Sequence, residues 1–225
     1  MIVFDKVSKK FPLGNLALDQ VSFAIEDNEF VFLVGPSGAG KTTILELILK
    51  KLSPTSGSII VDSINITDKN FNKVDSLRQK IGIVFQDFKI LPEKNIFENV
   101  IMSLQVVNSS SSLIKKEVKN ALMLVGLEEK RKLFPIQLSA GELQRVAIAR
   151  AICGDRKIIL ADEPTGNLDL KTAWEIMKIF KKIEGERTII IATHNPDIVN
   201  SLKKRVISLK NGKLIKDVRK GGYDL

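Results

Sequence analysis

The chain has 225 residues, of which 44% are hydrophobic and 27% charged, and its formal net charge is +9. These proportions are typical of a globular protein, and no apolar run approaches the ~20 residues that a membrane-spanning helix requires. The single cysteine, Cys153, excludes an internal disulfide and a cysteine-rich metal site, and the first residues do not resemble a signal peptide. We therefore expect one large domain or two small ones in a reducing compartment, with Cys153 as a buried apolar residue.

The positive charge is compatible with nucleic acid, an anionic membrane surface or a phosphate ligand as partner. The basic clusters are dispersed along the chain, at residues 9–10, 50–51, 115–116, 181–182 and 203–205. The chain has one Trp and one Tyr, so a platform for stacking bases is poorly supported. We interpret the clusters as solvated lysine faces and predict no nucleic-acid partner, with a membrane surface as the second choice.

The N-terminal part predicts short strands. Residues 2–7 and 21–25 alternate apolar and polar side chains, as half-buried antiparallel strands do. Phe30–Val34 is apolar throughout, which is typical of a central parallel strand. Residues 57–61 and 81–85 are two further strand candidates.

Residues 35–42, Gly-Pro-Ser-Gly-Ala-Gly-Lys-Thr, form a complete phosphate-binding motif between that central strand and a helix predicted over residues 43–49. The glycines allow backbone N–H groups to surround phosphate oxygens, and the helix N-terminus adds partial positive charge. Lys41 is expected to reach the β- and γ-phosphates, and the Thr42 hydroxyl to bind Mg²⁺. Nucleotide contacts are expected from Gly35, Pro36, Ser37, Gly38, Ala39, Gly40, Lys41, Thr42 and Thr43.

The middle of the chain predicts a helical insert over about residues 90–150. Ile96, Val100 and Leu104 recur at helical spacing after Pro92. The run at 108–112, Asn followed by four serines, predicts a linker whose last serines cap another helix. That helix carries an apolar face from residue 114 to residue 125 and ends at Gly126.

The C-terminal part returns to strands and helices. Residues 157–161 and Thr188–Thr193 are apolar strands that flank a helix starting near Leu170. The Asn211-Gly212 pair between residues 205–210 and 213–217 predicts a hairpin with a type I′ turn. The whole pattern predicts a single α/β domain, residues 1–225, with helices on both faces of a mostly parallel sheet, an N-terminal antiparallel β subdomain and the helical insert.

Asp162 and Glu163 follow the strand that ends at residue 161. In phosphate-loop enzymes an aspartate at such a strand end holds Mg²⁺, and a glutamate beside it is placed to polarise an attacking water. Two carboxylates beside a triphosphate would repel it unless a metal lay between them. The pair therefore predicts Mg²⁺ as a cofactor.

Residues 138–142, Leu-Ser-Ala-Gly-Glu, precede another helix and allow two interpretations. Ser139 and Glu142 fit an ordinary capping box. The same serine and Gly141 at a helix start also fit an anion site. Within one chain this site need not face the phosphate loop, so it predicts a role toward the nucleotide of a second copy.

These motifs occur in the order found in ATP-binding-cassette ATPases: the phosphate loop, Gln86, residues 138–142, Asp162-Glu163, then Asn-Leu-Asp at 167–169 and a histidine at 194. The chain resembles this family over nearly its whole length. The resemblance implies ATP as the nucleotide, a phosphate-loop NTPase core, and an ATP-dependent homodimer. In that dimer, each ATP lies between one copy's phosphate loop and the other copy's signature helix.

The resemblance also implies roles for individual residues. Phe11 matches the aromatic residue that stacks on adenine, and Gln86 matches the residue that senses Mg²⁺ and the attacking water near the docking region of a membrane partner. Glu163 matches the catalytic carboxylate, and Asp169 supports the dimer contact. His194, the only histidine, matches the residue that contacts the γ-phosphate. Catalysis would involve Glu163, His194, Lys41 and Gln86, and Mg²⁺ would be held by Thr42, Gln86 and Asp162.

In the signature, Ser139, Gly141 and Glu142 are expected to contact nucleotide, whereas Ala140 replaces a glycine and its methyl group could weaken closure. Residues 85–92 and 161–169 are similar to the cell-division ATPases of the family, which act with an integral membrane partner at the cytoplasmic face of the bacterial inner membrane. Lipoprotein-releasing and macrolide-efflux ATPases are the alternative. ATPases that act on DNA or the ribosome, and regulated binding modules without turnover, are less favoured.

Overall fold

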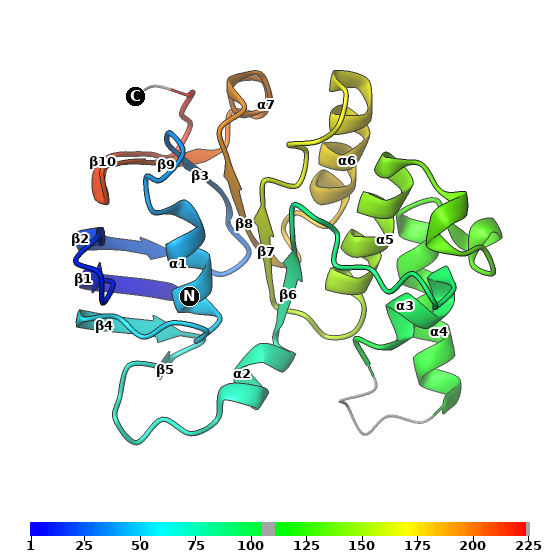
Figure 1. The fold of residues 1–225 in the computed structure, drawn as a ribbon, viewed down its shortest axis with the longest axis horizontal. Helices are drawn as coiled ribbons and strands as arrows, with labels where there is room; N and C mark the ends of the chain where they lie inside the picture. Colours follow the sequence, from blue (N-terminus) through cyan, green and yellow to red (C-terminus); the bar gives the residue numbers. More distant parts are fainter. Residues whose placement is uncertain (105–110, 224–225) are drawn as a thin grey trace.

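Apolar strands form a six-stranded, mostly parallel sheet at the centre of the computed structural model, which describes residues 1–104 and 111–223 (Figure 1). In spatial order the strands are β10 (Lys213–Val218), β9 (Arg205–Lys210), β3 (Phe30–Val34), β8 (Thr188–Thr193), β7 (Ile158–Asp162) and β6 (Ile81–Val84). All neighbours are parallel except β10, which pairs antiparallel with β9. Loops that follow β3, β8, β7 and β6 therefore begin at the same edge of the sheet.

The hairpin of β9 and β10 has the expected turn. Asn211 has φ +49° and Gly212 has φ +75°, and a type I′ turn requires positive φ at both central residues. The turn prediction is therefore confirmed.

The N-terminal strands form a separate antiparallel sheet, as predicted, in the order β2 (Leu16–Ile25), β1 (Ile2–Lys10), β4 (Ser56–Val61) and β5 (Ile64–Asn65). Phe4 and Phe23 lie opposite each other on β1 and β2, and their rings stack with centroids 4.6 Å apart. Both strands are longer than the alternating segments because they continue past register shifts, where the alternation is lost.

The helices are α1 (Lys41–Ile48), α2 (Val74–Gln79), α3 (Ile96–Ile101), α4 (Ser111–Leu124), α5 (Ala140–Ile152), α6 (Leu170–Lys182) and α7 (Pro196–Leu202), with short 3-10 turns at Glu128–Lys130 and Pro135–Gln137. The helices α3, α4, α5 and α6 lie together on one side of the sheet (Figure 1). In the described residues, no helix is both long enough and apolar enough to span a bilayer.

The helical insert differs from its prediction at one point. Leu104 does not belong to α3, because the helix ends at Ile101 and tightens into a turn in which Ser103 bonds Val100 O and Leu104 N bonds Ile101 O at 2.9 Å. Leu104 is nevertheless buried, as its spacing suggested. Most of the predicted serine linker, residues 108–110, lies outside the described residues.

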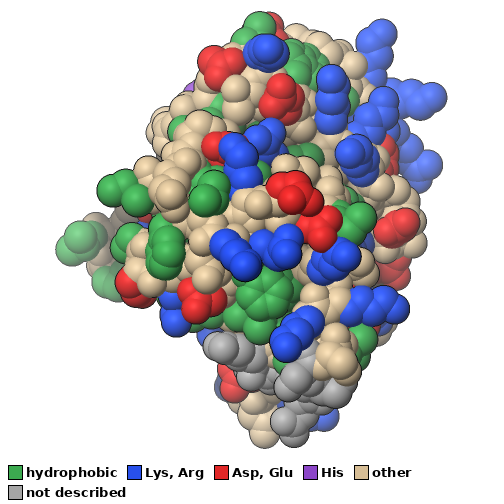
Figure 2. Space-filling view, turned by 90° about the vertical axis from the view of Figure 1, so that its right-hand side faces the viewer, with side chains coloured by type: hydrophobic (Ala, Val, Ile, Leu, Met, Phe, Trp, Pro, Cys, Tyr) green, Lys and Arg blue, Asp and Glu red, His purple; other side chains and the backbone are tan. Residues whose placement is uncertain are grey.

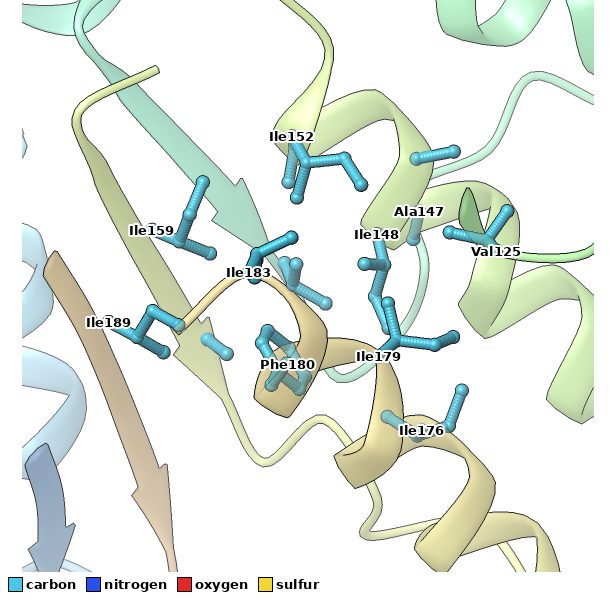
Figure 3. Close-up of a cluster of buried hydrophobic side chains, with 14 of the residues drawn as sticks. Val125, Ala147, Ile148, Ile152, Ile159, Ile176, Ile179, Phe180, Ile183 and Ile189 are labelled. Atoms are coloured by element: carbon cyan, nitrogen blue, oxygen red, sulfur yellow. The ribbon is translucent and has the colours of Figure 1, made fainter. Parts of the chain in front are cut away.

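Two apolar cores lie on opposite faces of the sheet. Along β3, Phe30, Phe32 and Val34 pack into one core and Val31 and Leu33 into the other, which explains why this strand is apolar throughout. Figure 3 shows part of the first core, where Phe180 and other α6 residues pack between β7, β8 and α5. The second core joins α1 and the antiparallel sheet to the opposite face.

On the helical side of the molecule, basic side chains gather at the upper right of the view and are interspersed with acidic ones over the rest of the face (Figure 2). Ion pairs such as Lys119–Glu128 and Arg145–Glu175 contribute to this mixture. Over most of this face the charges are mixed, which is compatible with solvated lysines.

Phe180→Ala is expected to lower the free energy of unfolding by about 3–5 kcal/mol, because Phe180 is fully buried and its removal leaves a cavity between sheet and helices. Urea denaturation would measure the change. Ile215→Ala on β10, where the side chain is 55% exposed, is the control and should change stability by no more than about 0.5 kcal/mol. Equal effects of the two substitutions would contradict the described core.

Candidate nucleotide site

The phosphate loop connects β3 to α1 with its backbone amides open to a ligand. Gly40 precedes α1 with φ +106°, and no side chain caps the helix, so its first N–H groups are free to bind an anion. A Cβ on Gly40 would lie 2.7 Å from Ala17 O, and one on Gly35 would lie 2.3 Å from Leu209 O. The loop therefore depends on glycine at both positions for its close approach to neighbouring backbone.

Lys41 is the buried cation of this loop, with the whole residue only 7% exposed. Its Nζ donates hydrogen bonds to Gly35 O at 2.7 Å and Pro36 O at 3.1 Å. It also lies 3.9 Å from Glu163 Oε1. The ammonium group is thus held by the loop itself, at the place where phosphate oxygens would enter.

Thr42 and Asp162 meet across the gap between α1 and the end of β7. The Thr42 hydroxyl donates to Asp162 Oδ2 at 2.8 Å. Burial raises the pKa of Asp162, and the neighbouring Glu163 carboxylate adds to the increase, whereas the Thr42 hydrogen bond opposes it. A bound cation would relieve this cost of a buried negative charge.

Glu163 and His194 form a contact between the ends of β7 and β8. His194 Nδ1 lies 2.7 Å from Glu163 Oε1, and the His194 backbone N–H donates to Glu163 Oε2 at 3.3 Å. The imidazole is otherwise accessible, with its side chain 63% exposed. Both side chains lie at the carboxyl edge of the sheet because β7 and β8 are parallel neighbours.

Phe11 and Gln86 lie at the periphery of this group. Phe11 belongs to the β1–β2 turn, where its N–H donates to Asn15 O at 2.8 Å, and Lys9 Nζ lies 5.4 Å from its ring centroid. Gln86 follows β6, with its amide nitrogen close to Gly166 in the loop after Glu163. Gln86 follows a strand, as the sequence predicted.

One open pocket of about 660 Å³ brings these residues together. Of the predicted site residues, it is lined by Phe11, Pro36, Ser37, Gly38, Ala39, Gly40, Lys41, Thr42, Thr43, Gln86, Asp162, Glu163 and His194. Gly35 does not line it and contributes instead the carbonyl that holds Lys41. The volume lies within the range typical of small-molecule sites.

Three lining residues were not predicted: Asn15, Ala17 and Tyr223. Asn15 and Ala17 lie close to Phe11 in the sequence. The resemblance of Phe11 to an adenine-stacking residue could therefore have indicated that its neighbours also line the pocket. Tyr223 follows β10, and its N–H donates to Asn200 Oδ1 at 2.7 Å. Burial raises the pKa of Tyr223, and the charge of Glu163 contributes. No sequence motif surrounds it.

The signature turn at the start of α5 does not line this pocket. Both interpretations of it remain, because the capping box is present: Ser139 Oγ accepts from Glu142 N, and Glu142 Oε2 accepts from Ser139 N at 2.9 Å. Ser139 and Ala140 are exposed, whereas Gly141 is buried, and a Cβ there would lie 2.4 Å from Thr172 Cγ2. The turn is therefore accessible to another molecule.

Glu142 does not leave an unpaired charge at this turn. Lys130 forms an ion pair with it, and this bond, together with those from Ser139, lowers the pKa of Glu142 to about 2. Asp169, the other residue predicted at the dimer contact, caps α6 by accepting a hydrogen bond from Thr172 N at 3.0 Å.

The donor set fits Mg²⁺ bound together with a nucleotide. In the described part of the chain, no group of three His, Cys, Asp or Glu side chains is arranged to hold a metal alone. Mg²⁺ usually takes one or two protein oxygens and completes its shell with water and phosphate. The Thr42 hydroxyl and the Asp162 carboxylate are such oxygens, and Gln86, which lines the same pocket, offers an amide oxygen.

A phosphate loop, a strand-end carboxylate pair and a histidine around one pocket, with a capped signature turn outside it, define an ATP-binding cassette. The family model "ABC transporter" matches residues 18–166. The chain belongs to this family, and its curated relatives narrow the match to the cell division ATP-binding protein FtsE.

FtsE of Bacillus subtilis is 45% identical over 99% of this chain and 98% of the relative. FtsE of Escherichia coli is 40% identical over 95% of this chain and 97% of the relative. Among solved structures, the dimeric bacterial cassette MJ0796 superposes with a TM-score of 0.87 at 36% identity, covering 99% and 100% of the two chains. A post-hydrolysis dimer of MJ0796 bound to ADP and Pi also has a TM-score of 0.87, at 35% identity and the same coverage.

Lys130→Met is expected to raise the pKa of Glu142 from about 2 toward its ordinary value of 4.5, because the Lys130 ammonium is the largest cause of the lowering. Because the folded pKa is the lower one, the ion pair stabilises the protein above about pH 4.5, and this contribution is lost as the pH falls toward 2. An NMR titration of the Glu142 carboxyl carbon would measure the shift. The exposed Lys132→Met is the control, and equal pKa values in both variants would contradict the pairing.

Proposed function

We propose that this protein is a Mg²⁺-dependent ATPase that closes as a homodimer on two ATP molecules. The observation that carries the proposal is the convergence of Lys41, Thr42, Asp162, Glu163 and His194 around one pocket. These groups provide phosphate binding, cation binding and a base, which is the set that phosphoryl transfer to water requires. ADP and Pi in the related MJ0796 dimer support a nucleotide in this pocket.

Each residue has a defined task in this proposal. The amides before α1 and Lys41 would bind the phosphates. Thr42 and Asp162, assisted by Gln86, would hold Mg²⁺, which would supply neutralisation of phosphate charge. Glu163 polarises the attacking water, and Phe11 stacks on the adenine. His194 exchanges its contact with Glu163 for one with the γ-phosphate. Catalysis then rests on positioning and on stabilisation of charge.

The homodimer follows from the position of the signature turn. Ser139, Gly141 and Glu142 lie outside their own chain's pocket, so their helix N-terminus would complete the pocket of a second copy. The dimeric form of MJ0796 supports this arrangement. Pairing of Glu142 with Lys130 limits the repulsion that a carboxylate would impose on ATP.

The work done by hydrolysis is the finer part of the proposal. We infer that opening and closing of the dimer moves an integral membrane partner similar to FtsX, docked near Gln86 at the cytoplasmic face of the bacterial cell membrane, and so controls cell-wall hydrolases during division. Similarity to FtsE over nearly the whole chain favours this role. The ATPase of a lipoprotein-releasing or macrolide-type exporter is less favoured, since curated relatives 41–45% identical to this chain are FtsE proteins.

Glu163→Gln is expected to reduce ATP hydrolysis by about 10²–10⁴-fold, the contribution of a general base, and to accumulate an ATP-loaded dimer. Hydrolysis would be measured by phosphate release and the dimer by light scattering after gel filtration. Both depend on Mg²⁺, so EDTA should abolish hydrolysis in the unmodified protein.

The matched control is Glu186→Gln, which removes an exposed carboxylate away from the pocket. It should hydrolyse ATP at the unmodified rate and remain monomeric after turnover. Normal hydrolysis by Glu163→Gln would refute the role of Glu163, and a strictly monomeric ATP-loaded variant would refute the dimer.

Affinity purification of the Glu163→Gln variant from detergent-solubilised membranes with ATP is expected to enrich an FtsX-like integral membrane protein, identified by mass spectrometry. The Glu186→Gln variant should recover less, since its dimer opens after hydrolysis. Recovery of a lipoprotein-releasing or macrolide-type membrane subunit would instead favour the alternative function.

A further inference from the structure

Gln144 is a buried polar residue on α5 that the proposed chemistry does not use. The residue is 1% exposed, and its Nε2 donates to Pro164 O at 2.7 Å. Its Oε1 has no hydrogen-bond partner among the described residues. A buried acceptor without a partner costs free energy, so the side chain is poorly explained as a stabilising element.

The carbonyl that Gln144 binds belongs to the residue directly after Glu163. Glu163 itself has φ +47°, in the left-handed region that side chains other than glycine rarely adopt. Such a conformation persists only when surrounding bonds impose it. Around Glu163 these bonds are Glu163 N to Ala192 O at 2.9 Å, Gly166 N to Glu163 O at 3.1 Å, and Gln144 to Pro164 O.

Helix α5 also contacts the far end of the same loop. Gly141 packs so closely on Thr172 that a Cβ would lie 2.4 Å from its methyl group. Thr172 in turn donates its N–H to Asp169 at 3.0 Å. The first two turns of α5 therefore hold residues 163–169 at both ends.

We propose that Gln144 is a positioning residue that fixes the backbone of Glu163 to the signature helix. The Nε2 bond to Pro164 O holds the peptide after Glu163, so the carboxylate is aimed at the nucleotide pocket. This inference rests on the proposed role of Glu163 as the catalytic carboxylate.

Gln144→Met tests it, because Met has similar length and fills the site but cannot donate a hydrogen bond. We expect kcat for ATP hydrolysis to fall about tenfold, the factor that corresponds to loss of one net hydrogen bond, while KM for ATP changes less than about twofold. Tm should change little, because loss of the unpaired Oε1 offsets the cost of leaving Pro164 O without its donor. A purely structural role would lower Tm.

A second readout does not depend on ATP. Hydrogen–deuterium exchange followed by mass spectrometry should show faster exchange in residues 163–168 of Gln144→Met, whose Gly166 amide binds Glu163 O. The matched control is Ile148→Met, which alters a buried residue one turn further along α5 and should leave kcat and this exchange unchanged.

The inference would be overturned if Gln144→Met had both the kcat and the exchange rate of the unmodified protein. It would also be overturned if the fall in kcat were accompanied by a matching fall in Tm, or if Ile148→Met lowered kcat equally. If the unmodified protein failed to hydrolyse ATP, the proposed function would fail, and the exchange experiment alone would decide whether Gln144 holds the Glu163 backbone.

Discussion

The parallel pairing of β3, β8, β7 and β6 is the constraint on which the nucleotide site depends. Each strand delivers one functional group at its carboxyl end: the phosphate loop, His194, Asp162 with Glu163, and Gln86. These groups are separated by up to about 160 positions in sequence, yet neighbouring parallel strands lie only about 4.8 Å apart. Burial of both sheet faces in apolar cores keeps that spacing rigid, so the core is what gives the site its precision.

The charged and polar groups of the site are paired with neighbouring groups of the same chain. Lys41 donates to carbonyls of its own loop, Thr42 donates to Asp162, and Glu163 contacts His194. Each of these contacts occupies a group that we assign to phosphate, Mg²⁺ or water. These internal bonds keep the buried polar groups of the site satisfied. Such pairing explains how the charges of Lys41 and Glu163 tolerate being largely removed from water.

Apolar strands and glycine-rich turns are local signals that can be recognised in the sequence. Loops that follow parallel strands meet at one edge of the sheet, and this rule brings the separate motifs together. The sequence therefore predicted the sheet and most of the pocket. The short helices α2 and α7, of six and seven residues, were missed because they contain too few residues to show a periodic pattern. Tyr223 reaches the pocket only through tertiary folding after β10, and no local pattern predicts that. Gln144 was also invisible, since a glutamine in a helix is ordinarily exposed and only the fold buries it against Pro164.

The bonds around residues 163–169 join two surfaces that would contact different nucleotides. In the proposed function, the signature turn at Ser139 would face the ATP of a second copy, whereas Glu163 would act on the ATP of its own chain. Because Gln144 and Gly141 tie the turn to both ends of the loop, a displacement of α5 would also displace the backbone of Glu163. A packed core transmits such displacement without absorbing it. Hydrolysis at one pocket would then depend on whether the partner's pocket is closed, which is the coupling that a two-site dimer needs to act as a unit.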